Sequence, residues 1–294
     1  MEITAIIPSY NYGHMIARAI DSALAQTHPL AEILVIDDGS TDNTSEVVAR
    51  YGAPVRYFRR TNHGLSASRN YGLREARTEW VALLDADDYW LPEKTERQVQ
   101  EIGRTPGAQV CYTGTLVDYE RDQRKSEFIA PAPEELWPYL RYRNIIVPSS
   151  VLARRELFLS LNGFDEKLTS CEDWDMWVRL GEKAGWAAAR EALTGYRMSD
   201  TSMSANVQRM MDNTMRILDG TLLDGYRGLD RWLWRHRIVS NALFTGFITA
   251  RYARQRDYGK WLLRSLRAWP SPFFVPLRYK TLLFEIRHGF RFEE

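Results

Sequence analysis

The sequence predicts an α/β protein in which a mainly parallel sheet is flanked by helices and followed by a helical C-terminal region. Short runs rich in Ile and Val alternate with helix-period segments through the first third of the chain. Apolar strands joined by helices in this way are typical of a parallel sheet covered on both faces. Beyond Thr201 the pattern becomes helical and rich in arginine and aromatic residues, which indicates a second region built from helices.

The alternation is clearest before residue 85. The expected strands are Ile3–Pro8, Glu32–Ile36, Val55–Arg59 and Trp80–Leu84, and the expected helices are Ile16–Ala25, Thr44–Arg50 and Ser66–Ala76. The strands are short and rich in β-branched or aromatic residues, whereas the helices repeat apolar residues at intervals of three or four. Right-handed crossovers bring the carboxyl ends of such strands to one edge of the sheet, where ligands bind.

The middle of the chain predicts two more strands and one prominent helix. Gln109–Asp118 and Ile145–Arg154 are expected as strands, and the charged segment Glu120–Lys125 between them as a turn. Glu172–Ala184 is expected as an amphipathic helix because its apolar residues recur at helical spacing.

The charge distribution predicts two domains. The whole sequence has a formal net charge of +1, but residues 1–205 contain 23 basic and 30 acidic residues, whereas residues 206–294 contain 16 basic and 8 acidic residues. We therefore place a domain boundary between residues 205 and 206. With 45% hydrophobic and 26% charged residues, the composition argues against a disordered chain, a collagen-like repeat and a polytopic membrane protein.

Cysteine usage and the N-terminal residues predict a cytoplasmic protein. Cys111 and Cys171 are too few for a disulfide framework and lack the spacing of a zinc site. The first residues show neither the basic nor the apolar region of a secretory signal. The longest uncharged stretch of the basic tail, residues 238–250, is shorter than the roughly 20 residues that span a bilayer.

A pair of carboxylates, Asp85 and Asp87, directly follows the strand expected at Trp80–Leu84. Two anions on one turn repel each other and lose hydration, and a divalent cation relieves both costs. Mg²⁺ and Mn²⁺ prefer carboxylate oxygens together with substrate phosphates. The pattern is compatible with a metal site and, equally, with a solvated acidic turn before the next helix.

A second acidic pair, Asp37 and Asp38, follows the strand expected at Glu32–Ile36. A carboxylate at this edge can accept a hydrogen bond from a base or a ribose hydroxyl, and Ser40 or Thr41 is expected to cap the next helix. The first strand is not followed by G-x-G-x-x-G, and the chain has no Walker A sequence. The first absence argues against nicotinamide or flavin binding, and the second argues against P-loop phosphoryl transfer.

Five motifs occur in a fixed order along the chain. They are Ala5-Ile6-Ile7-Pro8-Ser9-Tyr10-Asn11, Val35-Ile36-Asp37-Asp38-Gly39-Ser40-Thr41-Asp42, Gly64-Leu65-Ser66-Ala67-Ser68-Arg69-Asn70, Leu84-Asp85-Ala86-Asp87-Asp88 and Glu172-Asp173-Trp174-Asp175. This series resembles that of family 2 glycosyltransferases. The resemblance implies a GT-A fold, which is a Rossmann-like, mainly parallel sheet, with residues 1–205 as the nucleotide-sugar-binding and catalytic domain. It further implies a nucleotide-diphosphate-sugar donor, a Mg²⁺ or Mn²⁺ cofactor and inversion at the anomeric carbon.

The resemblance also assigns a donor site. Its residues are Pro8, Ser9, Tyr10, Asn11, Asp37, Asp38, Arg69, Asp85, Ala86 and Asp87. Tyr10 would lie against the base, Asp38 would accept a hydrogen bond from it, and Asp37 would shape the turn. Packing in the core is the alternative for Tyr10.

Four charged residues would act on the diphosphate and the acceptor. Arg69 would neutralise the diphosphate, for which a permanently charged guanidinium is suited, with a surface ion pair as the alternative. Asp85 would lie near the ribose or sugar, and Asp87 would bind the metal. Asp173 would be the general base, although an acid at a helix start is also a favourable capping charge.

The sequence departs from the family pattern at one site. The segment Tyr196-Arg197-Met198-Ser199 has serine where many relatives have a histidine near the metal or phosphates, so phosphate binding would rest more on Arg197. The Q-x-x-R-W motif of processive polysaccharide synthases is absent. We therefore expect a non-processive hexosyl or related transferase.

The basic region 206–294 leaves two interpretations open. Between Arg231 and Arg291 there are 13 basic and two acidic residues, interleaved with aromatic ones. Such helices suit the inner, anionic face of a membrane, and equally a lobe in which arginine stems cover apolar surface. Nucleic-acid binding is less favoured because no recognised module accompanies the charge.

The expected function is inverting transfer of a sugar to an acceptor hydroxyl of a cell-surface glycan or lipid-linked intermediate. One alternative is a catalytically silent nucleotide-sugar-binding or docking protein, which the presence of both Asp87 and Asp173 disfavours. Another is a sugar nucleotidyltransferase. That class normally needs a glycine-rich basic loop where this chain has Ser9-Tyr10-Asn11-Tyr12.

Overall fold

The computed structural model describes residues 1–181, 184–199, 203–271 and 277–288. The chain forms two compact units. Unit 1 comprises residues 1–137 and 145–198, and unit 2 comprises residues 138–144 together with the chain from Ser199 onwards. The charge pattern places its boundary seven residues later and gives no indication that 138–144 group with the C-terminal region.

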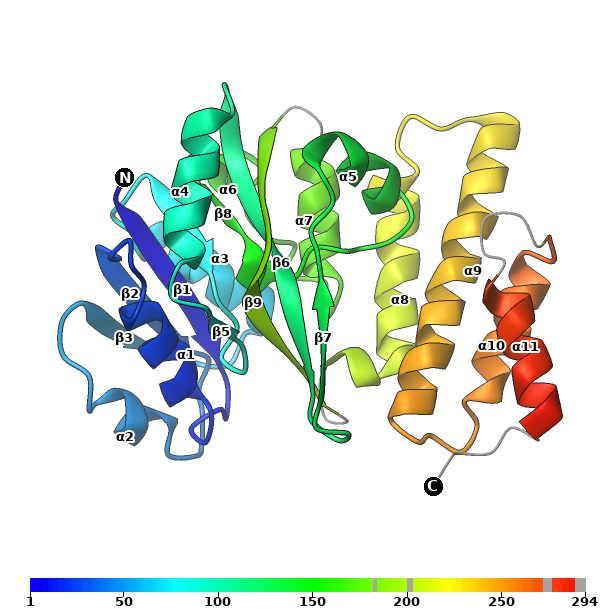
Figure 1. Cartoon of the computed structure of the whole chain (residues 1–294), viewed down its shortest axis with the longest axis horizontal. Coiled ribbons are helices and arrows are strands. Elements are labelled where there is room, and N and C mark those ends of the chain that lie inside the picture. Colours follow the sequence, from blue (N-terminus) through cyan, green and yellow to red (C-terminus); the bar gives the residue numbers. More distant parts are fainter. Residues whose placement is uncertain (182–183, 200–202, 272–276, 289–294) are drawn as a thin grey trace. The chain divides into compact units, whose positions relative to one another are not determined.

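Unit 1 is built on one mixed sheet with the strand order β3-β2-β1-β4-β8-β6-β9-β5, and β7 pairs with β6 (Figure 1). The strands are β1 Ile3–Ser9, β2 Glu32–Asp37, β3 Val55–Arg59, β4 Trp80–Leu83, β5 Tyr89–Trp90, β6 Ala108–Tyr119, β7 Arg124–Phe128, β8 Leu152–Arg154 and β9 Gly185–Met198. The neighbours among β1 to β4 pair in parallel, whereas β8 is antiparallel to both β4 and β6. The carboxyl ends of β1, β2 and β4 therefore share one edge.

Helices pack against the sheet in two groups. α1 Ile16–Leu24, α2 Thr44–Val48 and α3 Leu65–Glu75 pack on β1 and β2, whereas α4 Lys94–Arg104 packs on β6 and β9. The remaining helices of this part of the chain are α5 Pro133–Leu140, α6 Arg155–Ser160 and α7 Glu172–Leu180, with α5 ending in unit 2. Ile3, Ala5 and Ile7 of β1 share a buried core with α1 and α2. On the other face, a Cβ at Gly72 of α3 would approach Ile6 Cγ2 to 2.4 Å, so glycine allows this helix to lie close against β1.

Two predicted elements differ from the structure. Of the strand expected at Ile145–Arg154, only β8 forms, because Pro148 opens a 3₁₀ turn and cannot donate to a strand ladder. The helix expected to reach Ala184 ends at Leu180, where Gly181 takes a positive φ of 60° and stops the helix.

The predicted cap of α2 is also wrong. The helix begins at Thr44 after Asn43, so neither Ser40 nor Thr41 caps it. The N-cap position is Asn43, whose side chain forms no capping hydrogen bond, and Asp42 Oδ1 accepts from the N–H of Thr44, the first helical residue, at 3.0 Å.

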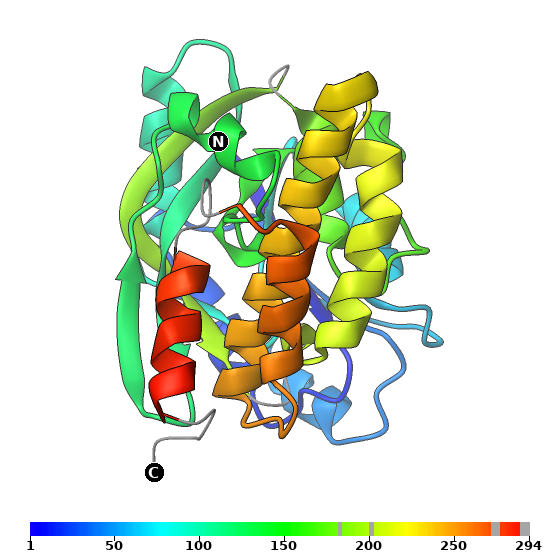
Figure 2. The ribbon, with the colours of Figure 1, turned by 90° about the vertical axis from the view of Figure 1, so that its right-hand side faces the viewer.

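Unit 2 is helical, as the sequence predicts. Its helices are α8 Val207–Ile217, α9 Gly228–Tyr252, α10 Gly259–Ala268 and α11 Leu277–His288, and a π-helical segment, Leu218–Leu222, follows α8 (Figure 2). α9 packs against α8 and α10, and Phe247, Trp261 and Leu262 lie in the shared core. Among the described residues, the helices lack the combination of length and apolar character that crossing a bilayer requires.

Candidate active site

The loops after β1 and β2 interlock at the carboxyl edge of the sheet. Ser9 at the end of β1 pairs with Asp37 at the end of β2. The Asn11 N–H donates to Ser40 Oγ at 2.8 Å, and Asn11 Oδ1 accepts from the Thr41 N–H at 2.8 Å. Asn11 has a φ of 60°, a conformation that asparagine tolerates better than most residues. These bonds join the two loops that carry the predicted nucleotide-binding residues.

Asp37 and Asp38 are buried, and both hold neighbouring segments in place. Asp37 accepts from the Tyr57 hydroxyl. The two oxygens of Asp38 accept from the His63 and Gly64 N–H groups at 3.0 and 2.7 Å. Because each carboxylate oxygen can accept a second hydrogen bond, these contacts leave Asp38 able to accept from a base as well.

The remaining predicted donor residues differ in exposure. Tyr10 is 47% exposed, so it is not packed in the core. Pro8 and Ser9 are buried, and Ser9 Oγ has no hydrogen-bond partner within the described part of the chain. Ala86 is also buried, which leaves its methyl group on the core side of the turn.

The two carboxylates that follow β4 lie on one closed turn. The Asp88 N–H donates to the Asp85 carbonyl at 3.0 Å, and the Tyr12 hydroxyl donates to Asp87 Oδ2 at 3.3 Å. Burial, followed by the charge of Asp85, raises the pKa of Asp87 to about 6. The turn therefore concentrates negative charge at the sheet edge, and a cation would relieve it.

Arg69 on α3 links this turn to α7. Its guanidinium donates to Asp85 Oδ1 at 2.6 Å and to Glu172 Oε1 at 2.5 Å, and its side chain is 1% exposed. The two carboxylates raise the pKa of Arg69 against the opposing effect of burial. The interpretation of Arg69 as a surface ion pair is wrong, because both contacts are buried or nearly so.

The three acids at the start of α7 have different surroundings. Glu172 is buried against Arg69, and Asp175 is buried with its Oδ2 accepting from Arg179 Nε at 2.7 Å. Asp173 is half-buried, and its Oδ1 accepts from the Trp174 N–H at 2.7 Å. Asp173 is therefore the most accessible of the three to an acceptor molecule.

Arg197 near the end of β9 also contributes to this edge. Its N–H donates to Asp88 Oδ1 at 3.0 Å, and its guanidinium pairs with Glu120 at 2.6 Å. Its charge opposes the rise in the pKa of Asp87. Ser199, the residue in place of the expected histidine, is buried and belongs to unit 2.

The donor set at the Asp85–Asp88 turn fits a divalent cation that completes its coordination with substrate. Within the described residues, no three His, Cys, Asp or Glu side chains gather to hold a metal alone. Mg²⁺ is usually held by one or two carboxylates together with substrate phosphates. Asp85 and Asp87 supply such a pair, and a cation would offset the repulsion that raises the pKa of Asp87.

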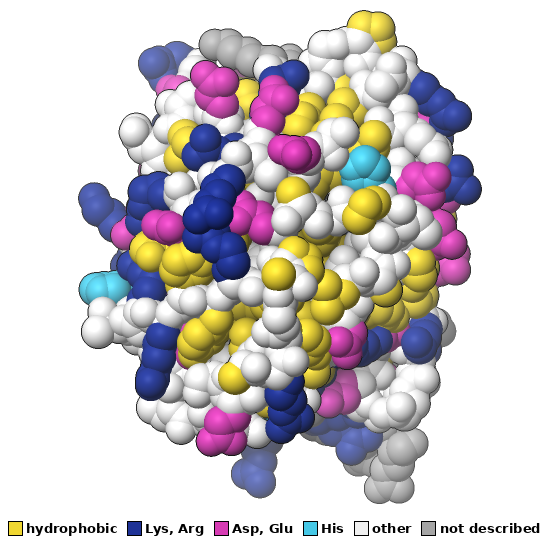
Figure 3. All heavy atoms as spheres, turned by 90° about the vertical axis from the view of Figure 1, so that its left-hand side faces the viewer, with side chains coloured by type: hydrophobic (Ala, Val, Ile, Leu, Met, Phe, Trp, Pro, Cys, Tyr) yellow, Lys and Arg dark blue, Asp and Glu magenta, His cyan; other side chains and the backbone are white. Residues whose placement is uncertain are grey.

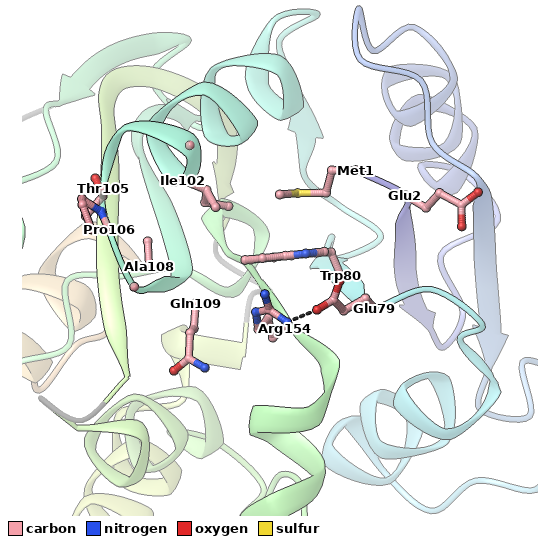
Figure 4. Close-up of a pocket in the computed structure, with 12 residues that line it drawn as sticks. Met1, Glu2, Glu79, Trp80, Ile102, Thr105, Pro106, Ala108, Gln109 and Arg154 are labelled. Atoms are coloured by element: carbon pink, nitrogen blue, oxygen red, sulfur yellow. Dashed lines mark ion pairs between the residues drawn. The ribbon is translucent and has the colours of Figure 1, made fainter.

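A cavity of about 690 Å³ lies at the opposite edge of the sheet (Figure 4). Met1, Trp80 and Arg154 line it, and Arg154 forms an ion pair with Glu79. Its lining includes none of the predicted site residues. The face of the protein seen in Figure 3 carries basic, acidic and apolar side chains interspersed, so charge does not single out another site there.

Two residues near the predicted site were not expected from the sequence. Tyr12 contacts Asp87, and its place two residues beyond Tyr10 in the first motif could have indicated it. Ser149 contacts Asp88 across a separation of 61 residues, and no sequence pattern points to it.

Comparison with known proteins identifies the family. Residues 4–157 match the family model described as glycosyl transferase family 2, a span of more than half the chain. The chain belongs to glycosyltransferase family 2. An uncharacterized glycosyltransferase of Rickettsia felis is 32% identical over 189 residues, which cover 60% of this chain and 31% of that protein. One of Rickettsia typhi is 29% identical over 232 residues, covering 75% and 71% of the two chains. The match thus spans about a third of the Rickettsia felis relative.

Solved structures show the same fold as this family 2 chain. The mannosyltransferase PcManGT of Pyrobaculum calidifontis, in complex with GDP-Man and Mn²⁺, superposes with a TM-score of 0.62 at 19% identity and covers 96% of this chain and 80% of its own. S. aureus TarS 1–349, in complex with UDP-GlcNAc, gives 0.61 at 18% identity and covers 91% and 81%. The predicted GT-A fold is confirmed.

Proposed function

We propose that the chain transfers a sugar, with inversion, from a nucleotide-diphosphate-sugar to an acceptor hydroxyl. The observation that carries this proposal is the buried Arg69, which joins the Asp85 turn to the first residue of α7. It ties a turn suited to a metal and diphosphate to the helix that carries a half-buried carboxylate, Asp173. A donor-binding group and a base are thus part of one rigid arrangement.

On the donor side, the interlocked loops after β1 and β2 would receive the base, with Tyr10 against it and Asp38 accepting from it. Asp87, with Asp85, would hold Mg²⁺ or Mn²⁺, which neutralises the developing charge on the leaving diphosphate. PcManGT was solved with GDP-Man and Mn²⁺, which supports this assignment. We assign Arg69 to positioning Asp85, because a guanidinium that is 1% exposed and engaged by two carboxylates is poorly placed to reach the diphosphate.

On the acceptor side, Asp173 would act as general base. Inversion by a single displacement requires a hydroxyl to attack opposite the leaving diphosphate, and its proton must be removed as the bond forms. Asp173 lies in the first turn of α7, where the helix dipole favours the ionised carboxylate. Glu172 and Asp175 are held by arginines, so they are less able to accept this proton.

The acceptor is proposed to be a growing cell-surface glycan or a lipid-linked intermediate, extended by one or few hexosyl residues. The exposed side of α10 supports an encounter with an anionic membrane. Lys260, Leu263, Arg264 and Arg267 are exposed at helical spacing, while Trp261 and Leu262 are buried in the unit 2 core. A helix with this distribution can bring cations to lipid headgroups without leaving its own core.

Donor binding gives the first test. UDP-, GDP- and dTDP-sugars are screened by thermal shift with and without Mn²⁺, since a ligand that binds only the folded state raises the melting temperature. We expect one donor to stabilise the protein in a Mn²⁺-dependent way, Asp87→Ala to abolish that shift, and Asp85→Ala to reduce it. Asp122→Ala, which removes an exposed carboxylate, is the control and should leave the shift unchanged.

The same samples separate the alternatives. Donor binding without transfer to any acceptor would indicate a silent binding protein, and pyrophosphate release from a nucleoside triphosphate and a sugar phosphate would indicate a nucleotidyltransferase. Full activity of Asp87→Ala in chelator-treated buffer would refute the metal assignment.

A further inference from the structure

A serine outside the five motifs lies beneath the Asp85–Asp88 turn. Ser149, in the 3₁₀ turn Pro148–Ser150 that precedes β8, is fully buried. Its Oγ accepts from the Asp85 N–H at 3.0 Å and donates to Asp88 Oδ2 at 2.5 Å. One hydroxyl therefore bonds both ends of the turn that carries the two proposed metal-binding carboxylates.

The other side of the turn is fixed as well. Asp88 is 1% exposed, and its Oδ1 accepts from the N–H of Arg197 on β9 at 3.0 Å. The Ser149 carbonyl accepts from Trp90 Nε1 at 2.7 Å, which holds the serine in place. The turn is thus tied to β9 and to a 3₁₀ turn, both of which are distant from it in sequence.

This arrangement separates the four residues of the turn by role. Ala86 and Asp88 are buried, whereas Asp85 and Asp87 are partly exposed. Two like charges on one short turn would relax apart if the backbone were free, and a cation would then have to restore their geometry when it bound. Hydrogen bonds around a metal site that fix its ligands are commonly worth 10- to 100-fold in metal affinity.

We propose that Ser149 is a positioning residue that acts with Asp88 to hold the Asp85–Asp87 pair in the conformation that receives a divalent cation. The inference rests on the proposed function, because it assigns the cation to that pair. It extends the site to a residue that would not bind the donor or the metal itself and that acts through the backbone of Asp85 and the carboxylate of Asp88.

The test measures Mn²⁺ affinity rather than turnover. Mn²⁺ is titrated into each folded protein at a fixed concentration of the donor that the thermal-shift screen identifies, and loss of the free-ion electron paramagnetic resonance signal beyond that caused by the donor alone gives the dissociation constant. We expect Ser149→Ala to weaken binding about tenfold. The matched control is Ser150→Ala, because Ser150 is also buried in the same turn but its hydroxyl donates to the Val147 carbonyl at 2.8 Å; its affinity should stay within about twofold of wild type, since that bond lies outside the carboxylate turn.

A double-mutant cycle tests whether Ser149 and Asp88 act together on metal binding. Asp88→Asn should weaken Mn²⁺ binding by a similar factor, and adding Ser149→Ala to it should cause little further loss, because residues of one network are not additive. Circular dichroism at the assay temperature confirms that each variant is folded. Wild-type affinity in Ser149→Ala, equal losses in the Ser149 and Ser150 variants, or additive losses in the cycle would each overturn the proposal.

Asp87→Asn distinguishes this failure from failure of the proposed function. If wild type and Asp87→Asn bind Mn²⁺ equally, the metal assignment itself is wrong and the role of Ser149 is refuted with it. If binding depends on Asp87 but not on Ser149, only the positioning role is refuted.

Discussion

The two units each contain a fully buried arginine, but they hold it differently. Arg69 in unit 1 contacts the carboxylates of Asp85 and Glu172, whereas Arg278 in unit 2 donates to the carbonyls of Ser265 and Ser271, both at 2.9 Å, and to the Ser240 hydroxyl. The carboxylates raise the pKa of Arg69, whereas burial lowers that of Arg278.

The difference shows how one residue type serves two purposes. In unit 1 the cation holds two carboxylates at the candidate site, so removing it affects both charge balance and geometry. In unit 2 the cation joins α9, the end of α10 and α11 through neutral oxygens, so its role is to connect helices.

The largest expected effect is on catalysis. Asp173→Asn should lower transfer about 10²- to 10⁴-fold while leaving the fold and donor binding intact, because it removes the proton acceptor but keeps the shape. Steady-state transfer and donor thermal shifts measure the two quantities. Asp175→Asn is the matched comparison on α7, and it should reduce stability through the Arg179 pair more than it reduces turnover. Unimpaired transfer by Asp173→Asn would remove this residue from the mechanism.

Removing the two buried arginines compares the units directly. Arg69→Met leaves two carboxylates without their cation and should lower the free energy of unfolding by about 3–5 kcal/mol. Arg278→Met leaves neutral acceptors and should lower it by about 1–3 kcal/mol. Urea denaturation of both variants gives these values. A larger loss of unfolding free energy in Arg278→Met than in Arg69→Met would show that the carboxylates of Asp85 and Glu172 are readily hydrated when Arg69 is absent.

Lys94 on α4 is a second buried basic residue of unit 1, but its hydrogen-bond partner is a neutral amide rather than a carboxylate. Its Nζ donates to Gln98 Oε1 at 2.8 Å, and burial lowers its pKa to about 7. The unfolded chain has the usual lysine pKa near 10.4, so between about pH 7 and pH 10 it binds more protons than the folded protein, and stability rises with pH.

The measurement compares wild type with Lys94→Met, so that other titrating groups cancel. Between pH 7 and pH 9, wild type should gain about 2 kcal/mol of unfolding free energy relative to the variant. Parallel pH profiles of the two proteins would show that Lys94 keeps its proton on folding.

The smallest expected effect concerns the surface of unit 2. Arg264→Gln combined with Arg267→Gln should weaken binding to vesicles rich in phosphatidylglycerol about 30-fold at low salt, since each cation near such a surface contributes about 1 kcal/mol. Arg97→Gln with Arg104→Gln removes two exposed cations from α4 and should change binding little. Sedimentation with vesicles measures both pairs. A wild-type protein that does not bind at low salt would favour the lobe interpretation.

The parallel strands were predictable because burial on both faces leaves a nearly continuous apolar run, as in Ile3–Ser9 and Glu32–Asp37. β9 was missed because Gly185–Met198 is rich in alanine and contains only one β-branched residue, Thr194, whereas strands are usually rich in such residues. The strand expected at Ile145–Arg154 failed for the opposite reason, since its isoleucines and valines suggest a strand but surround Pro148, which opens a 3₁₀ turn.

At the site, the motifs indicated which carboxylates gather at the sheet edge but not what each one contacts. The burial of Arg69 could not be inferred, because its partner Glu172 is 103 residues away and nothing local encodes the pairing. The role of Ser149 was hidden for the same reason. The sequence likewise does not show which of the three acids of α7 are paired with arginines. Glu172 pairs with Arg69 and Asp175 with Arg179.

The interlocked loops after β1 and β2 have a consequence for protein engineering. Besides the bonds of Asn11, the Gly13 N–H donates to Asp42 Oδ2 at 2.9 Å, and a Cβ at Gly13 would come within 2.2 Å of Asn43 Oδ1. Neither loop can be replaced without disturbing the other. A chimera intended to accept a different nucleotide must therefore take residues 9–13 and 37–44 from the same parent protein. Exchanging one loop alone would break the hydrogen bonds between the two loops.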